Sequence, residues 1–180
     1  PYTTLFRSAL GNFFKAASGM SWYKNTLFVL TADHTAKAEK PYYKGKVGMY
    51  AIPLVFYMPT DPFFRGIDSG IAQQADIMPS VLDYLNYHKP FVAFGRSVFD
   101  TSGPAYSVSY LNGIYQIIIN NYALCFDGQH YVSLFDFGKD AACQYNILPN
   151  NPELADSLGM FLKAVVQEYN YSLLNNKLVP

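Results

Sequence analysis

The sequence has little cysteine and no long apolar run. Only 2 of its 180 residues are cysteine, and they form no CxxC pair and have no histidine cluster nearby, so a zinc site built on them is not expected. A disulfide between Cys125 and Cys143 stays open, because two cysteines do not define an oxidising compartment. No apolar run is long enough to span a membrane, and no signal-peptide pattern begins the chain.

An excess of charge of either sign is also missing. The 13 basic and 13 acidic residues cancel, and no basic block or stripe is present, so a nucleic-acid partner is not expected. Apolar side chains are abundant instead, since 51% of the residues are hydrophobic and 17% are aromatic. This composition predicts a packed globular protein of one domain, or one domain with a small subdomain.

One stretch joins a predicted strand to two chemically active side chains. The apolar run from Leu27 to Leu30 predicts a strand buried on both faces, and it stops shortly before Asp33 and His34. Open α/β sheets bind their ligands at the carboxyl ends of such strands. A carboxylate oxygen beside an imidazole nitrogen suits Mn²⁺, Zn²⁺ or a similar divalent ion. Taken alone, an Asp after a strand is more often a turn or helix-cap residue.

The longer segment that contains this pair has a family resemblance. Residues 22–35, WYKNTLFVLTADHT, resemble the lipoteichoic acid synthase branch of the sulfatase-like families, within the alkaline phosphatase superfamily. Two later segments are similar to segments of the same families, DIMPSVLD at 76–83 and PFVAFGRSVF at 90–99. In that family the matching Asp and His bind the catalytic metal. The resemblance therefore implies Asp33 and His34 as ligands of Mn²⁺, or alternatively of Mg²⁺, Ca²⁺ or Zn²⁺.

The remaining patterns predict alternating helices and strands, followed by a meander. Amphipathic helices at 3–18 and 73–87 accompany the strands at 27–31 and 52–58, and a helix leading into a buried strand implies a parallel sheet. Asn-Gly and Asp-Gly pairs then predict hairpin turns in an antiparallel meander. The strands of that meander are expected at 105–111, 114–120, 121–126 and 130–136. A last helix, capped by Asn151 and opened by Pro152, is expected to lie on the meander.

We therefore expect an α/β fold in two parts. Residues 1–100 would form the C-terminal part of an alkaline-phosphatase-like sheet with flanking helices, and residues 101–180 a small antiparallel sheet packed by the C-terminal helix. Both strands of the first part are apolar at nearly every position. We therefore expect helices on both of their faces and further strands beside them, and these neighbours would lie upstream in the chain. A fragment without them is expected to cover the bare face and edge, most simply as a homodimer.

Several other polar residues receive structural interpretations. Asp76 is expected to cap a helix, and Arg96 to form a structural ion pair more often than a substrate contact. The lysines in or beside the loop at 35–49 are expected to be solvated, and the resemblance transfers no role to them. They are Lys24, Lys37, Lys40, Lys44 and Lys46.

The resemblance implies an enzyme whose nucleophile lies upstream of the Asp-His pair, a Thr in phosphoglycerol transferases or a formylglycine in sulfatases. Only 32 residues precede Asp33, all assigned to helix and strand, so we expect a C-terminal piece without the nucleophile. Alone, it is expected to be inactive and to hold its metal weakly or not at all.

The same resemblance implies the partners of the parent protein. They are the missing N-terminal half and a lipid-headgroup phosphodiester or a sulfated substrate. The parent would be membrane-anchored with this part extracytoplasmic, in the periplasm or outside the cell. The alternative is a non-catalytic module that binds a partner and carries a vestigial metal pair.

Overall fold

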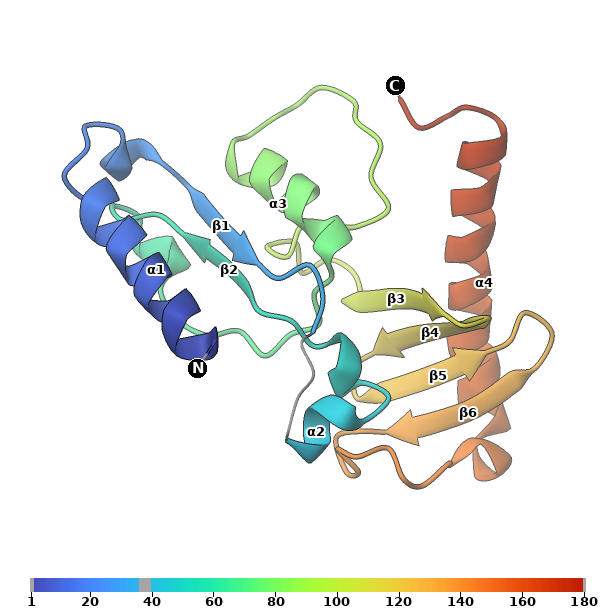
Figure 1. Ribbon diagram of the computed structural model, residues 1–180. Coiled ribbons are helices and arrows are strands. Elements are labelled where there is room, and N and C mark those ends of the chain that lie inside the picture. Colours follow the sequence, from blue (N-terminus) through green and yellow to red (C-terminus); the bar gives the residue numbers. More distant parts are fainter. Residues whose placement is uncertain (1, 36–39, 180) are drawn as a thin grey trace. The chain divides into compact units, whose positions relative to one another are not determined.

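The chain folds as two compact units in a computed structural model, which describes residues 2–35 and 40–179 (Figure 1). The first unit comprises Pro1–Thr31 and Pro53–Asp68, and the second comprises Ala32–Ile52 and Ser69–Pro180. The predicted division into 1–100 and 101–180 partitions the chain differently and stays a prediction. Each unit contains its own sheet, so each is described separately.

The first unit packs a helix and several aromatic rings around one phenylalanine. Phe28 lies at the centre, with ring centroids 5.1 Å from Phe14 and 6.1 Å from Tyr57. The hydroxyl of Tyr23 lies 3.1 Å from that of Tyr57 and satisfies it. The elements of this unit are α1 (Tyr2–Ala17), η1 (Tyr23–Asn25), β1 (Phe28–Thr31), β2 (Leu54–Tyr57) and η3 (Pro62–Phe64).

The two strands of this unit correct the sequence prediction. β1 pairs with β2 in the antiparallel sense, with Phe28 opposite Tyr57 and Thr31 opposite Leu54, so the predicted parallel pairing is wrong here. Between the strands the chain enters the second unit and returns, and the described residues of this connection contain no crossover helix of the βαβ kind. Both strands are only partly buried, and Val55 is 45% exposed, so burial on both faces is also not found in this part of the structure.

The second unit contains the predicted meander. Its sheet has the order β3-β4-β5-β6, all antiparallel, and consists of β3 (Tyr106–Leu111), β4 (Ile114–Ile119), β5 (Tyr122–Phe126) and β6 (Tyr131–Asp136). Asn112 and Gly113 both have positive φ, 52° and 84°, as a two-residue hairpin turn of this hand requires. The strand positions are therefore confirmed to within one residue, and the predicted turn at Asn112-Gly113 is confirmed.

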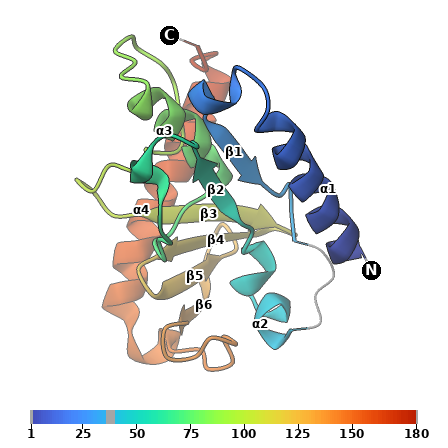
Figure 2. The same ribbon diagram turned by 90° about the vertical axis from the view of Figure 1, so that its left-hand side faces the viewer.

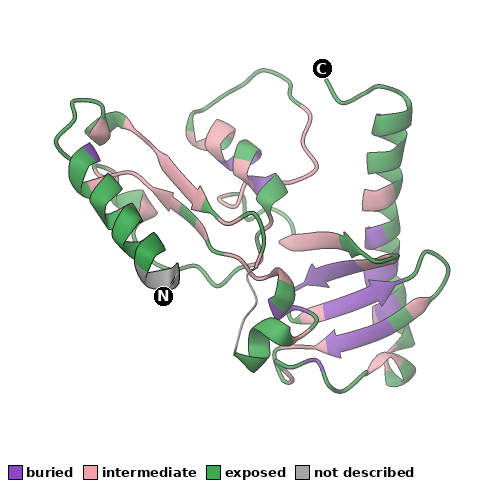
Figure 3. Ribbon diagram, in the orientation of Figure 1, coloured by how far each residue is buried: buried purple, intermediate pink, exposed green. Residues whose placement is uncertain are grey.

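One face of the meander packs on α4 (Pro152–Leu174), as the views in Figures 1 and 2 show. Leu158 and Leu162 of the helix meet Ile117, Leu124 and Leu134 of the strands in one buried cluster. Buried residues concentrate on β4, β5 and β6 (Figure 3). Asn151 precedes the helix, but its side-chain amide donates to the carbonyl of Ile147 instead of capping the helix, which corrects that prediction.

The opposite face of the meander is covered by Val47, from the loop after β1, and by Cys143, which follows β6 in the chain. Val47 and Cys143 pack there against Ile118, Ala123 and Phe135. The loop contains α2 (Pro41–Lys44) and η2 (Gly48–Tyr50). A Cβ at Gly48 would collide with the carbonyl oxygen of Tyr42, so the turn between these elements leaves no room for a side chain.

A buried carboxylate organises the segment before the meander. Asp76 is 2% exposed and accepts the backbone N–H groups of Gln73 and Arg96, each at 2.9 Å. It is therefore structural, as predicted, although it ties two segments together and does not cap α3 with its side chain. η4 (Gln74–Asp76) and α3 (Ile77–Tyr84) lie within the predicted helix, but Leu85 is 63% exposed and does not belong to a buried stripe.

Candidate metal site

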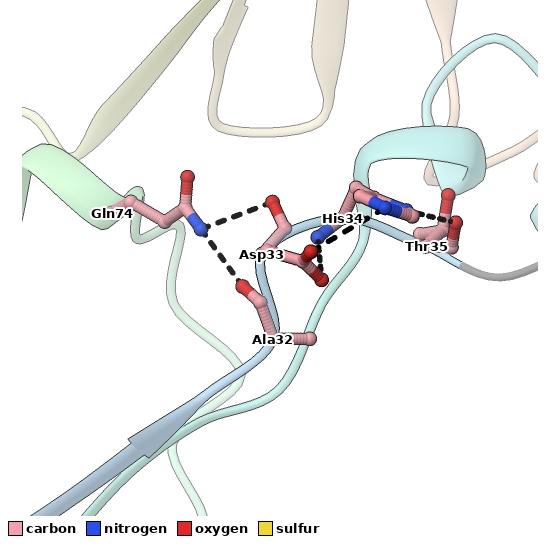
Figure 4. A network of polar contacts seen from close by, with 5 residues as sticks. All are labelled: Ala32, Asp33, His34, Thr35 and Gln74. Atoms are coloured by element: carbon pink, nitrogen blue, oxygen red, sulfur yellow. Dashed lines mark hydrogen bonds and ion pairs between the residues drawn. The ribbon is translucent and has the colours of Figure 1, made fainter.

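Asp33 and His34 follow β1 in the chain, and their side chains meet at the surface (Figure 4). Nε2 of His34 lies 3.4 Å from Oδ2 of Asp33, and the side chains are 78% and 86% exposed respectively. The two groups thus point to one accessible place, as the sequence predicts. Their role as metal ligands stays a prediction.

Local hydrogen bonds decide which atoms of this pair are free to bind. Nδ1 of His34 lies 2.9 Å from the carbonyl oxygen of Thr35. A carbonyl only accepts, so Nδ1 carries the hydrogen in the neutral ring and Nε2 has the lone pair. Oδ1 of Asp33 accepts the backbone N–H of His34 at 2.9 Å, which leaves Oδ2 opposite Nε2. In the neutral ring the two facing atoms are both acceptors, whereas in the protonated ring Nε2 donates to Oδ2.

This geometry fits a divalent ion. Two acceptors that face each other at 3.4 Å repel unless a proton or a cation lies between them. Ligands held about 2.0–2.1 Å from a tetrahedral metal stand about 3.3 Å apart, close to the observed separation. Within the described ranges no third His, Cys, Asp or Glu side chain joins the pair in a group able to hold a metal. The described residues thus offer two ligands, whereas a closed tetrahedral set has about four.

Four hydrogen bonds from three side chains hold the backbone of the loop that carries the pair. The hydroxyl of Thr35 donates to the carbonyl of Met49 at 2.5 Å. Further along, the side-chain amide of Gln116, on β4, donates to the carbonyl of Lys46 at 3.2 Å. Gln74, in η4, donates from Nε2 to the carbonyls of Ala32 at 2.8 Å and Asp33 at 3.2 Å (Figure 4).

Gln74 and Gln116 are not recognisable in the sequence as functional residues. Neither belongs to a motif, and an exposed Gln before a helix carries no periodic or turn signal. Their roles depend on which carbonyls lie within reach after folding. Only the neighbouring DIMPS segment, which places the start of a helix just after Gln74, could have directed attention there.

The described lysines in or beside the loop lie at the surface. Lys40, Lys44 and Lys24 are exposed, as predicted. The ammonium of Lys46 lies 4.5 Å from the centre of the Phe135 ring, on the meander. Lys37 lies outside the described residues.

Arg96 differs from its prediction, because it makes no ion pair with any residue in the part of the chain that the structure describes. The pKa of the Asp100 carboxyl is lowered mainly by hydrogen bonding from Ser102, and the positive charge of Arg96 makes a smaller contribution in the same direction. A substrate contact by Arg96 is not tested by this geometry.

The two cysteines are buried and free, which answers the question left open by the sequence. Burial, with a smaller contribution from the nearby carboxylate of Asp140, raises the pKa of the Cys143 thiol. Both thiols lie on the face of the meander opposite α4, where the structure gives them a packing role.

Comparisons with known proteins find a family match in the part of the chain that contains Asp33 and His34. Residues 8–87 match the family model described as Sulfatase. A curated relative, the multifunctional alkaline phosphatase superfamily protein PehA of Trinickia caryophylli, is 30% identical over 94 residues, which cover 49% of this chain and 18% of PehA. The chain thus spans less than a fifth of that relative.

Solved structures extend the likeness beyond the family match. The phosphonate monoester hydrolase of Agrobacterium radiobacter superposes with a TM-score of 0.65 at 18% identity, covering 89% of this chain and 39% of the hydrolase. A protein from a Bacteroides thetaiotaomicron locus for the metabolism of multiple glycosaminoglycans gives 0.64 at 18% identity, covering 86% and 42%. At this identity the likeness concerns the fold, and it includes the meander as well as the matched segment.

Proposed function

Because this chain belongs to the sulfatase/alkaline phosphatase superfamily, we propose that it supplies two ligands of a divalent-metal site in an enzyme acting on phosphodiesters or sulfate esters. The observation that carries the proposal is the 3.4 Å approach of Oδ2 of Asp33 to Nε2 of His34 at an exposed place. Members of the superfamily use divalent metals, and the donor set suits Mn²⁺ or Zn²⁺.

The finer identity that we propose is the C-terminal part of a lipoteichoic acid synthase-like phosphoglycerol transferase. The support is the likeness of residues 22–35, 76–83 and 90–99 to that branch. The substrate would be a lipid-headgroup phosphodiester, and the protein would be membrane-anchored with this part outside the cytoplasm. A phosphonate monoester hydrolase among the similar structures is compatible with phosphorus chemistry, and sulfate esters remain the other substrate class.

In this proposal the residues of the chain bind and orient. Asp33 contributes a negatively charged oxygen, and the hydrogen bond from Nδ1 to Thr35 holds the His34 ring with Nε2 outward. When bound, a divalent ion supplies charge neutralisation for the transferring group and activates a nucleophile. The nucleophile and the remaining ligands would come from an N-terminal half, the partner segment that we propose for this chain.

Calorimetric titration with Mn²⁺ tests the site. We expect weak binding, because two ligands leave most of the coordination to water, and we expect Asp33→Asn and His34→Gln to abolish it. A matched control is His130→Gln. His130 also faces an aspartate, Asp127, but at 3.9 Å through Nδ1, and binding should not change. Equal loss in the control would refute the assignment.

Two further measurements separate this proposal from the non-catalytic alternative. The isolated chain should not turn over a bis-aryl phosphodiester, and sub-micromolar Mn²⁺ affinity or measurable turnover would show that the site is misplaced. The coding sequence upstream should encode a Thr or Cys nucleophile and another acidic ligand. Their absence there would favour a partner-binding module with a vestigial metal pair.

A further inference from the structure

We infer that Gln74 is a positioning residue for the metal pair, an inference that rests on the proposed function. Its side-chain amide has two N–H donors, and each is directed to a carbonyl of the metal-ligand segment. One bond goes to Ala32, at 2.8 Å, and the other to Asp33, at 3.2 Å (Figure 4). A single side chain therefore holds two successive peptide groups, one of which belongs to a proposed ligand.

The contacts within the pair cannot do this alone. Asp33 accepts the N–H of His34, and His34 bonds Thr35, so these bonds join only consecutive residues. Such local bonds orient the two side chains relative to each other, but they leave the position of the segment undetermined. Gln74 lies 41 residues away from Asp33 in the chain, and it fixes the segment from outside.

Gln74 is adjacent in the chain to a buried hydrogen-bond network centred on Asp76. The neighbouring carboxylate of Asp76 is buried and accepts N–H groups from Gln73 and Arg96, on both sides of α3 in the chain. A Cβ at Gly95 would collide with the carbonyl group of Ala75, so the 94–97 segment lies directly on η4. This buried network fixes the position of Gln74. The two hydrogen bonds of Gln74 in turn fix the position of the ligand segment.

The test compares Gln74→Met, which keeps the length of the side chain but lacks both donors, with Gln167→Met on the exposed side of α4. The readout is the Mn²⁺ concentration that half-broadens the NMR signals of residues 33–35. We expect the Gln74 variant to need about tenfold more Mn²⁺, as for the loss of outer-shell partners of metal ligands. Gln167→Met should titrate like the unsubstituted chain.

Thermal unfolding of each variant verifies the fold, because a purely structural role would change stability without changing metal affinity in the folded chain. If Gln74→Met does not fold, Gln74→Glu replaces it, since a carboxylate of the same shape accepts where the amide donates. An unchanged Mn²⁺ requirement in a folded Gln74 variant overturns the inference and leaves the proposed site standing. Absence of localised broadening in the unsubstituted chain overturns the proposed site, and this inference with it.

Discussion

Single residues hold the segments of this protein in place through contacts that allow little substitution. Gly95 lies against the backbone of Ala75 and Asp76, and the buried Asp76 carboxylate accepts two N–H groups. A buried carboxylate is costly unless it is hydrogen-bonded, and here both oxygens are used. At this scale, stability depends on backbone groups that side chains satisfy or leave room for.

Gly95→Ala should be strongly destabilising. The added Cβ would overlap the carbonyl group of Ala75, and the backbone would have to move. We expect a loss of about 1–3 kcal/mol in the free energy of unfolding, or more if the Asp76 bonds are also broken. Urea denaturation measures it. Gly103→Ala is the control, because nothing lies within 4 Å of the position that its new methyl group would take, and an equal loss there would contradict the steric cause.

The stability contributed by Asp127 should depend on pH. Backbone N–H groups of His130 and Gln129 donate to its Oδ1 at 2.6 and 2.7 Å and lower the pKa of the carboxyl. Because the folded pKa lies below the unfolded one, this stabilisation is present above roughly pH 4 and is lost as the pH falls through the lowered pKa.

The measurement compares the melting temperatures of the unsubstituted chain and Asp127→Asn across this pH range. Asn keeps an acceptor oxygen but has no charge, so the variant should melt lower at neutral pH. The two curves should converge in acid. A gap that is constant with pH would mean that the charge of Asp127 contributes nothing to the turn.

Elements differ in how well the sequence predicts them. The meander is predictable because its strands and turns are local signals, and Asn112-Gly113 fixes the turn type and the register of β3 against β4. The direction of β1 against β2 is not predictable in this way. The apolar run Leu27–Leu30 indicates a strand, but it does not indicate which strand pairs with it or in which direction. The ligand pair is visible in the sequence, whereas Gln74 is not, because its bonds are made only by tertiary contact.

The packing of α4 on the meander should depend on a few inward residues. Leu162 is 0% exposed and lies in the main buried cluster, so Leu162→Ala should cost about 2–5 kcal/mol of unfolding free energy. Met160, on the same helix, is 67% exposed, and Met160→Ala should change stability by no more than about 0.5 kcal/mol. Chemical denaturation of both variants checks this, and similar losses would mean that α4 packs otherwise than described.

At the scale of the whole molecule, apolar surface remains uncovered. On α1, Leu5, Phe6 and Phe13 are 67%, 69% and 50% exposed. Exposed apolar patches of this kind are typical of surfaces that bind another protein segment. The described helices include none with the length and apolar content to cross a membrane. The self-association expected from the sequence concerns the face and edge of the first sheet, and we propose α1 as a further surface for it.

Sedimentation at micromolar concentration should show association of the unsubstituted chain. Phe6→Glu should shift it toward monomer, because a charge in an apolar contact is costly to desolvate. Leu174→Glu is the control, since that residue is 84% exposed on α4, which belongs to the second unit. A monomeric unsubstituted chain that melts cooperatively and binds no apolar dye would mean that the fragment is self-sufficient and the association hypothesis is wrong.

The division of the chain into two units has a consequence for inheritance. The chain passes from one unit to the other after Thr31, again before Pro53, and again after Asp68. A single recombination breakpoint at any of these places splits at least one unit between two genes. Neither unit can therefore be gained or lost by one exchange, in contrast to domains that are consecutive in sequence. The segment with the proposed ligands should accordingly descend together with both sheets.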